Sequence, residues 1–448
     1  MQPKQRSGYP SRLKPQRRPR RRLLILTAAL AGCGLLAAFA TQVPAVQDQL
    51  AFRISDLRAR IKYAISPPEE VIFVPDSTLS AMVQATLTSL APSPTSVGPS
   101  PVPTEAATPM PAPTPLPQRV VIEGVKYEDQ HNRWNYCGPA NFSMALTFWG
   151  WNGNRDVIGQ VIKPSDKDKN VMPYEYQDYV ADNLPGMNTV LRHGGDIELL
   201  KRLLAAGFPV ITEKGYYERD YTGKLGWLGH YQFVTGYDDA EGALIVQDTY
   251  LDGPDFHIPY DDFIEGWRSF NYVFVVSYPV EQQAAVFESL GPWGDERWAS
   301  MHALEVALAE GESLSGIDQF FAWFNAGSSH VELQQYVDAA FAYDHAFSLY
   351  AALDADDSTR PYRIMWYQTG PYWAYYYSGR YGDVINLSTQ TLDNMAEPSL
   401  EESYYWRALS KEALGDLGGA MDDLRTSLLF HPGFAPSLSQ LERLGGLP

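Results

Sequence analysis

Cysteine is almost absent from this chain of 448 residues. Only Cys33 and Cys137 occur, which excludes a disulfide framework and a cysteine-rich zinc site. The sequence contains no HExxH motif and no GxxxxGK[ST] nucleotide loop, and none of its eight histidines lies at metal-ligand spacing from another. We therefore expect no metal and no other cofactor. The length exceeds that of a typical domain, so more than one folded unit is predicted.

Basic residues are scarce beyond the N-terminus. The formal net charge is −18, and nine of the 35 Lys and Arg residues fall within residues 1–22, which contain no acid. The body that follows is therefore strongly acidic. An acidic body repels phosphate backbones, and no local basic patch offsets this repulsion. The sequence thus predicts no nucleic-acid binding.

One long apolar run is present, at residues 23–40, directly after the basic tail of residues 1–22. As a helix, its 18 uncharged residues span about 27 Å, enough to cross the hydrocarbon core of a bilayer. The positive-inside rule keeps the basic tail in the cytoplasm and places the remainder outside. We expect a single-pass signal-anchor in the cell membrane and an extracytoplasmic body. A lipoprotein box at Leu30-Ala31-Gly32-Cys33 and a cleaved signal ending at Ala38-Phe39-Ala40 are alternatives that also export the body.

Two connecting segments follow. Residues 41–91 are predicted to be a juxtamembrane stalk, in which Leu50 to Ile65 forms an amphipathic helix that could also lie on the membrane or pair with a partner. Residues 92–118 are a Pro/Ser/Thr-rich linker, because residues 92–117 hold ten of the 33 prolines and one charge, Glu105. In polyproline II geometry this linker would reach roughly 80 Å.

Between residues 119 and 281 the pattern indicates an α+β domain. Helices are predicted at Pro139 to Trp149 and at Ile197 to Ala206, where Gly207 ends the second helix. Apolar strands are predicted mainly after the helices. The strands are expected at residues 120–122, 209–212, 230–237, 243–247 and 272–278. A helix-first domain with a C-terminal antiparallel sheet is the result.

Residues 297–445 have a helical and weakly repetitive pattern. Small, apolar and proline positions of the tetratricopeptide consensus recur there, although the period is loose. The matching residues are Gly415, Ala420, Leu424 and Pro432 in one copy, Gly327, Tyr336, Ala339, Tyr343 and Ala346 in an earlier copy, and Gly379, Tyr381 and Val384 in a weaker third. We predict an all-α array of about three repeats that binds a protein partner. The aromatic string at residues 366–377 is interpreted as repeat core, with a sugar-stacking platform as the alternative.

Cys137 opens the first predicted helix of the α+β domain and is the candidate nucleophile. A thiol reacts as the thiolate, which the unpaired N–H groups at a helix N-terminus stabilise. His230 begins one predicted strand and Asp248 follows another, so a Cys–His pair oriented by a carboxylate can form. Each residue alone also has a purely structural interpretation. Cys137 could be a small buried residue, His230 a histidine with its hydrogen bonds made inside the fold, and Asp248 a turn residue.

Residues from about 119 to 280 resemble the free-standing relatives of the double-glycine-leader peptidases, the papain-like domains that process bacteriocin precursors. The resemblance lies in Cys137-Gly138-Pro139-Ala140, in Leu199 to Ile211, in Gly229 to Asp238, and in Gln247-Asp248-Thr249-Tyr250. It implies a papain-like cysteine peptidase fold and a glutamine that donates to the oxyanion. Gln130 is the matching residue, seven positions before the cysteine where six are common. The chain departs from the transporter-linked members because it has no multi-span membrane domain.

The sequence therefore predicts a bacterial, membrane-anchored, extracytoplasmic thiol peptidase that acts on peptide or protein substrates. Cys137 attacks the carbonyl, His230 transfers the proton, Asp248 orients the imidazole, and Gln130 with the Cys137 N–H stabilises the oxyanion. Two alternatives remain. One is a non-hydrolytic peptide-binding module or scaffold, and the other is a thiol-dependent peptide transferase that uses the same residues.

Overall fold

The computed structural model describes residues 44–68, 71–76, 115–219, 225–354 and 360–447. The chain divides into two compact units, residues 1–54 and residues 55–448, and the second contains all that follows. The predicted membrane segment, residues 23–40, and most of the predicted linker lie outside the described residues. Within the described ranges, no helix is both long enough and apolar enough to cross a membrane.

An antiparallel sheet forms the centre of the α+β domain. Its strand order is β2-β7-β3-β4-β5-β6, and β1 pairs with β4. The strands are β1 (Arg119–Val121), β2 (Met187–Arg192), β3 (Val210–Arg219), β4 (Leu225–Asp238), β5 (Ala243–Asp248), β6 (Phe256–Pro259) and β7 (Phe274–Pro279). The register places Gln232 of β4 opposite Asp248 of β5. Asp248 thus comes within two residues of His230 along the neighbouring strand.

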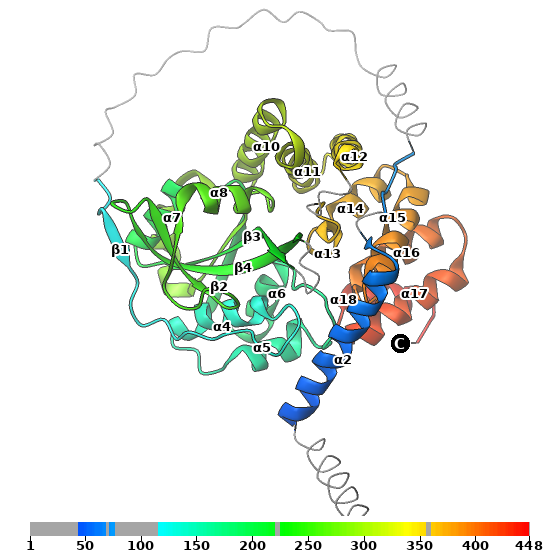
Figure 1. Ribbon diagram of the computed structural model, residues 1–448, viewed down its shortest axis with the longest axis horizontal. Coiled ribbons are helices and arrows are strands. Elements are labelled where there is room, and N and C mark those ends of the chain that lie inside the picture. Colours follow the sequence, from blue (N-terminus) through cyan, green and yellow to red (C-terminus); the bar gives the residue numbers. More distant parts are fainter. Residues whose placement is uncertain (1–43, 69–70, 77–114, 220–224, 355–359, 448) are drawn as a thin grey trace, which may run out of the picture. The chain divides into compact units, whose positions relative to one another are not determined.

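Helices cover both faces of this sheet (Figure 1). One face carries α4 (Cys137–Phe148), α5 (Arg155–Ile162) and α6 (Tyr174–Asn183), and the other carries α7 (Ile197–Ala205), α8 (Tyr260–Arg268) and α9 (Gln283–Leu290). Each face has its own core because side chains alternate along a strand. On β4, Phe233 packs in the core that contains α4, whereas Val234 packs in the core that contains α7. The predicted α+β class is confirmed.

Several boundaries differ from the sequence prediction. Helix α4 begins at Cys137, two residues earlier than predicted, and β3 and β4 are much longer than predicted. His230 therefore lies inside β4 and not at its start. The long β3–β4 ribbon was missed because residues such as Lys214, Gly215 and Gly229 interrupt its apolar pattern. The short strands β2 and β6 and the helices α5, α6 and α8 were also not predicted.

The C-terminal region is helical, as expected. Its main helices are α10 (Glu296–Ser313), α11 (Gly316–Glu332), α12 (Tyr336–Ala352), α13 (Ile364–Tyr367), α14 (Gly370–Tyr377), α15 (Tyr381–Asn394), α16 (Glu401–Ala413), α17 (Leu417–Phe430) and α18 (Ala435–Arg443). The small predicted repeat positions Ala339 and Ala420 are fully buried. A Cβ atom at Gly327 would lie 2.7 Å from the Tyr343 ring, so glycine permits the close approach of α11 and α12. The tetratricopeptide assignment itself stays a prediction.

Most of the aromatic string at residues 366–377 is buried, including Tyr372 and Tyr375. Trp373 and Tyr377 are 39% and 53% exposed, so part of the string reaches the surface.

Part of the predicted stalk lies against the helical region. The predicted amphipathic helix forms within α2 (Pro44–Ile65), and Arg58 pairs with Glu397 at 2.6 Å. Further along, the Phe73 ring packs edge-on against Phe347, with ring centroids 5.0 Å apart. Residues 58–68 and 71–76 therefore extend the helical region.

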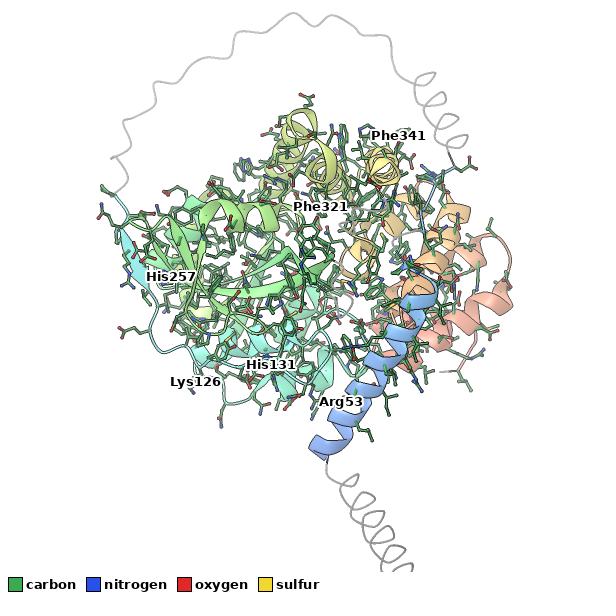
Figure 2. All side chains as sticks on the ribbon, viewed as in Figure 1. Arg53, Lys126, His131, His257, Phe321 and Phe341 are labelled. Atoms are coloured by element: carbon green, nitrogen blue, oxygen red, sulfur yellow. The ribbon has the colours of Figure 1, made fainter. Side chains whose placement is uncertain are left out.

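The helical region also packs directly on the α+β domain. Trp227 of β4 contacts Phe321 of α11, which is labelled in Figure 2. It also contacts Tyr367 of α13, and the ring centroids are 5.6 Å apart in both pairs. A fully buried ion pair joins Lys169, in the loop before α6, to Glu401 of α16. Strand β4 is thus held from the side by helices.

Candidate active site

Cys137 occupies the first position of α4 and is a free, buried cysteine, 3% exposed. Asn141, one turn later, donates from Nδ2 to the Cys137 carbonyl and to the Tyr231 carbonyl, both at 2.9 Å. Tyr231 directly follows His230 on β4. This amide therefore fixes the start of the helix against the strand that carries the imidazole.

His230 contacts both other members of the predicted triad. Its Nε2 lies 3.2 Å from Asp248 Oδ2, although the two atoms are not aligned for a hydrogen bond. The Cys137 thiol lies close enough to the ring to help raise the pKa of His230. Because Nε2 faces the carboxylate, Nδ1 is the nitrogen left for sulfur. The structure thus brings Cys137, His230 and Asp248 together in the predicted order.

The charges of the group support one another. Burial of the imidazole lowers the pKa of His230, but the Asp248 carboxylate and the Cys137 thiol outweigh burial and raise it to about 10. Burial raises the pKa of Asp248, but the His230 charge and hydrogen bonds hold it far below its usual range. At neutral pH the imidazole is therefore a cation that can give a proton to a leaving amine.

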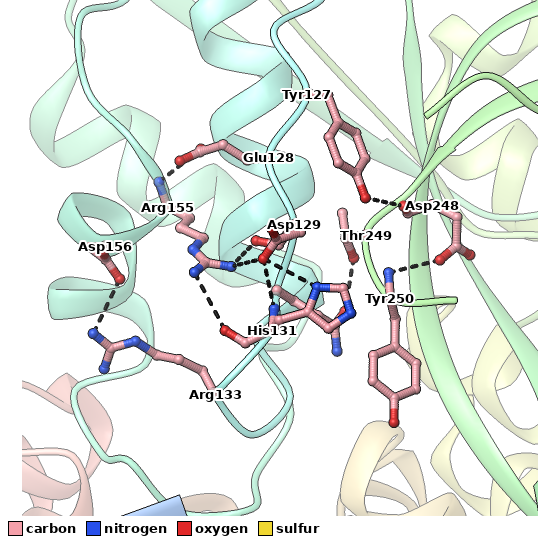
Figure 3. A network of polar contacts seen from close by, with 11 residues as sticks. Tyr127, Glu128, Asp129, His131, Arg133, Arg155, Asp156, Asp248, Thr249 and Tyr250 are labelled. Atoms are coloured by element: carbon pink, nitrogen blue, oxygen red, sulfur yellow. Dashed lines mark hydrogen bonds and ion pairs between the residues drawn. The ribbon is translucent and has the colours of Figure 1, made fainter. Parts of the chain in front are cut away.

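Asp248 is held at both oxygens. Gln232 Nε2 donates to Oδ2 at 2.7 Å. The backbone N–H groups of Tyr250 and Leu251 donate to Oδ1 at 2.8 and 2.9 Å, and the first of these is drawn in Figure 3. Oδ1 of Asp248 therefore accepts from the backbone of the turn, while Oδ2 faces the His230 imidazole.

Gln130 lies in the loop before α4, beside the residue that follows Asp248. Thr249 Oγ1 donates to Gln130 Oε1 at 2.8 Å, and the Gln130 N–H donates to the Thr249 carbonyl at 2.9 Å. The same loop is held by Tyr127, which donates to the Asp248 carbonyl at 2.8 Å, and by an Arg155–Asp129 ion pair at 3.0 Å (Figure 3). With its oxygen engaged, the Gln130 amide has Nε2 as the end that can donate to an oxyanion.

Residues 122–275, which contain all four of these side chains, match the family model described as the Peptidase_C39 like family. This segment is a C39-like peptidase domain. The match confirms the papain-like cysteine peptidase domain that the sequence resemblance implied.

Other comparisons add little to this assignment. A crystal structure described as a C39-like peptidase from Bacillus anthracis is 17% identical, and the similarity covers 36% of this chain and 97% of that one. Its TM-score is 0.30. No curated protein matches the chain.

The C39-like domain also contains a buried acid that sequence reasoning missed. Glu213 of β3 is 1% exposed, and Asn170 Nδ2 donates to its Oε1 at 3.0 Å. Burial, followed by the nearby Cys137 thiol, raises the pKa of Glu213 well above its usual range. A neutral acid beneath the site does not repel a thiolate. Asn141 and Gln232 were missed as well, because their partners are set by tertiary contacts.

A potential metal-binding group lies elsewhere. Among the described residues, Glu175, Glu401 and His431 have ligand atoms within 4.8 Å of one another. Lys169 Nζ contacts Glu401 Oε1 and already places a cation there. The group shares no residue with the Cys137 site.

Proposed function

We propose that the C39-like domain cleaves peptide bonds with Cys137 as nucleophile, His230 as acid and base, Asp248 as the residue that positions the imidazole, and Gln130 as an oxyanion donor. The set formed by the Cys137 thiol, His230 and Asp248 supports the proposal most directly, because His230 Nε2 lies 3.2 Å from Asp248 and the thiol helps raise the pKa of His230. Such a set is the general arrangement of an activated thiol nucleophile.

The reaction follows in two steps. The Cys137 thiolate attacks the carbonyl carbon, and the resulting oxyanion accepts hydrogen bonds from Gln130 Nε2 and the Cys137 N–H. Protonated His230 gives its proton to the leaving amine as the C–N bond breaks, which leaves a thioester. Neutral His230 then takes a proton from water, whose oxygen attacks the thioester. The carboxylic acid leaves, and the thiolate–imidazolium pair is restored.

The site is closed in this structure, since Cys137 and His230 are 3% and 5% exposed. Side chains that cover it therefore move when a substrate enters. Tyr216 is a neighbour of the site, since its ring lies edge-on to His230 with centroids 5.6 Å apart.

The test uses the full chain and a pool of internally quenched peptides. Cys137→Ala should lower cleavage by at least about 10³-fold, because no other group can form the thioester. Cys33→Ser removes the chain's other cysteine and should leave cleavage unchanged. A fluorescent iodoacetamide should label Cys137 in the Cys33→Ser variant, and His230→Ala should slow this labelling.

Two results would replace hydrolysis with another function. Peptide binding without cleavage, equally tight in wild type and Cys137→Ser, would identify a binding module. A product joined to an added amine, formed faster than the hydrolysis product, would identify a peptide transferase.

We also propose that residues 1–40 anchor the chain in the cell membrane and that the body lies outside. The basic tail and the apolar run that follows it support this orientation. Protease added to intact cells should digest the body if the proposal is right. Fatty-acid labelling that Cys33→Ser abolishes would replace the signal-anchor with a lipid anchor.

A further inference from the structure

The helical region reaches the strand that carries the catalytic histidine. A Cβ atom at Gly229 would lie 2.8 Å from Cδ1 of Tyr367, so this ring from α13 packs on the backbone directly before His230. Gln368, next to Tyr367, donates from Nε2 to the Ser269 carbonyl at 2.7 Å. Helix α13 is therefore part of the surroundings of the catalytic site.

Arg363, just before α13, faces the same strand. Its guanidinium lies over the rings of Tyr362 and Trp366, 4.6 and 5.2 Å from the ring centroids. A Cβ atom at Gly226, four residues before His230, would lie 4.0 Å from one terminal nitrogen of Arg363. Among the described residues the half-buried guanidinium makes no hydrogen bond and no ion pair. The rings hold the guanidinium in place, and within the described part of the chain Asp168 and Glu218 interact with it only through their charges.

The segment before the nucleophile is linked to Arg363 through Asp168. Asn135, two residues before Cys137, donates from Nδ2 to Asp168 Oδ1 at 2.7 Å. Burial raises the pKa of Asp168, and the strongest opposing influence is the charge of Arg363. Arg363 therefore lies beside the strand that leads to the imidazole, and its charge acts on the Asp168 carboxylate that accepts a hydrogen bond from Asn135.

We infer that Arg363 binds a carboxylate of the peptide substrate and makes the peptidase selective for acidic peptides. This inference rests on the proposed function, since the selected peptide is the one that is cleaved. A guanidinium presents paired N–H donors that match a carboxylate, and rings stacked beneath it keep its plane fixed. The carboxylate belongs to an Asp or Glu side chain or to the end of the peptide. The helical region then contributes to selectivity as well as to recruitment.

The experiment compares full-length wild type with Arg363→Gln, Arg363→Glu and Arg425→Gln. Arg425, an exposed arginine of α17 paired with Asp422 at 3.3 Å, is the matched control. Internally quenched decapeptides carry Glu, Gln or Lys at each position in turn, with either a free or an amidated C-terminus. Wild type should prefer one carboxylate by about 10- to 100-fold in kcat/KM, as a charge-assisted pair predicts. A preference for Glu over Gln identifies a side-chain carboxylate, and a preference for the free over the amidated C-terminus identifies the end of the peptide.

Arg363→Gln should abolish this preference and Arg363→Glu should turn it toward Lys, while Arg425→Gln keeps it. Equal cleavage of all peptides by wild type, or a preference that Arg363→Gln preserves, would overturn the inference and leave the peptidase standing. If wild type cleaves no peptide, the proposed function fails. Binding of the same decapeptides, followed by fluorescence anisotropy, then decides the inference. Arg363-dependent preference for the carboxylate supports it, and its absence rejects it.

Discussion

Thr249 donates a hydrogen bond to the side-chain oxygen of Gln130 over 2.8 Å, across 119 residues of sequence. A second bond, from the Gln130 N–H to the Thr249 carbonyl at 2.9 Å, fixes the backbone of the same pair. Thr249 follows Asp248 directly. The element that orients the imidazole therefore also orients the proposed oxyanion donor, and a displacement of one would displace the other.

Gln130→Ala should lower kcat by about 10²- to 10³-fold, because it removes one oxyanion donor. The rate of Cys137 alkylation should stay the same, since alkylation forms no oxyanion. Thr249→Val keeps the Gln130 amide but removes the hydrogen bond that fixes its rotation, so we expect a smaller loss of kcat than in Gln130→Ala. If Gln130→Ala slows alkylation as much as turnover, the residue supports the fold of the loop and not the oxyanion.

Asp248→Asn should reduce turnover and change how stability depends on pH. The folded-state pKa of His230 is raised to about 10 from an unfolded value of about 6.5. Its stabilising contribution is thus full below about pH 6.5 and is lost as the pH rises through about 10. Asp248 has a lowered pKa, so its contribution is present above about pH 3.9 and is lost as the pH falls further.

The free-energy difference between wild type and Asp248→Asn should therefore be largest from about pH 4 to pH 6.5 and should shrink toward pH 10. Urea unfolding at pH 5, 7.5 and 10 measures it. Asp196→Asn is the control, because Asp196 caps α7 through the Leu199 N–H at 2.6 Å and asparagine can do the same. A difference that stays constant up to pH 10 would show that Asp248 does not stabilise a charged His230.

The sequence was sufficient to propose Cys137 and Asp248 because each stands where a local pattern changes, whereas His230 lies inside β4. Cys137 starts a helix, and Asp248 ends an apolar strand. The β3–β4 ribbon could not be predicted in the same way, because its polar and glycine residues are buried by helices far away in the chain. Trp227 shows this, since its aromatic partners are Phe270, Phe321 and Tyr367. No local periodicity encodes those contacts.

The buried pair of Lys169 and Glu401 should stabilise the attachment of the helical region to the peptidase domain. Both side chains are at most 1% exposed, so removal of Lys169 takes the lysine charge from the buried Glu401 carboxylate and leaves it with His431, 2.7 Å away. Lys169→Met should reduce the free energy of unfolding by about 3–5 kcal/mol. The double variant with Glu401→Gln should recover part of that loss. Urea unfolding of wild type, Lys169→Met, Glu401→Gln and the double variant completes a double-mutant cycle.

A neighbouring ion pair is the control for this comparison. Lys167 pairs with Glu397 at 2.7 Å, and its side chain is 28% exposed. Lys167→Met should change the free energy of unfolding by only about 0–1 kcal/mol, because solvent screens the pair. Equal effects of Lys169→Met and Lys167→Met would show that the buried pair does not hold the two regions together.

Ala420 tests how closely the last helices of the predicted repeat array are packed. It is fully buried on α17, in a core shared with Ala408 and Leu424. Ala420→Phe should destabilise the protein by about 1–3 kcal/mol, because the larger side chain forces α16 and α17 apart. Leu429→Phe, on the same helix but 74% exposed, should have little effect on thermal unfolding followed by far-ultraviolet circular dichroism. Equal melting temperatures for the two variants would mean that α17 accepts a large side chain at this position, which a tetratricopeptide-like stack does not.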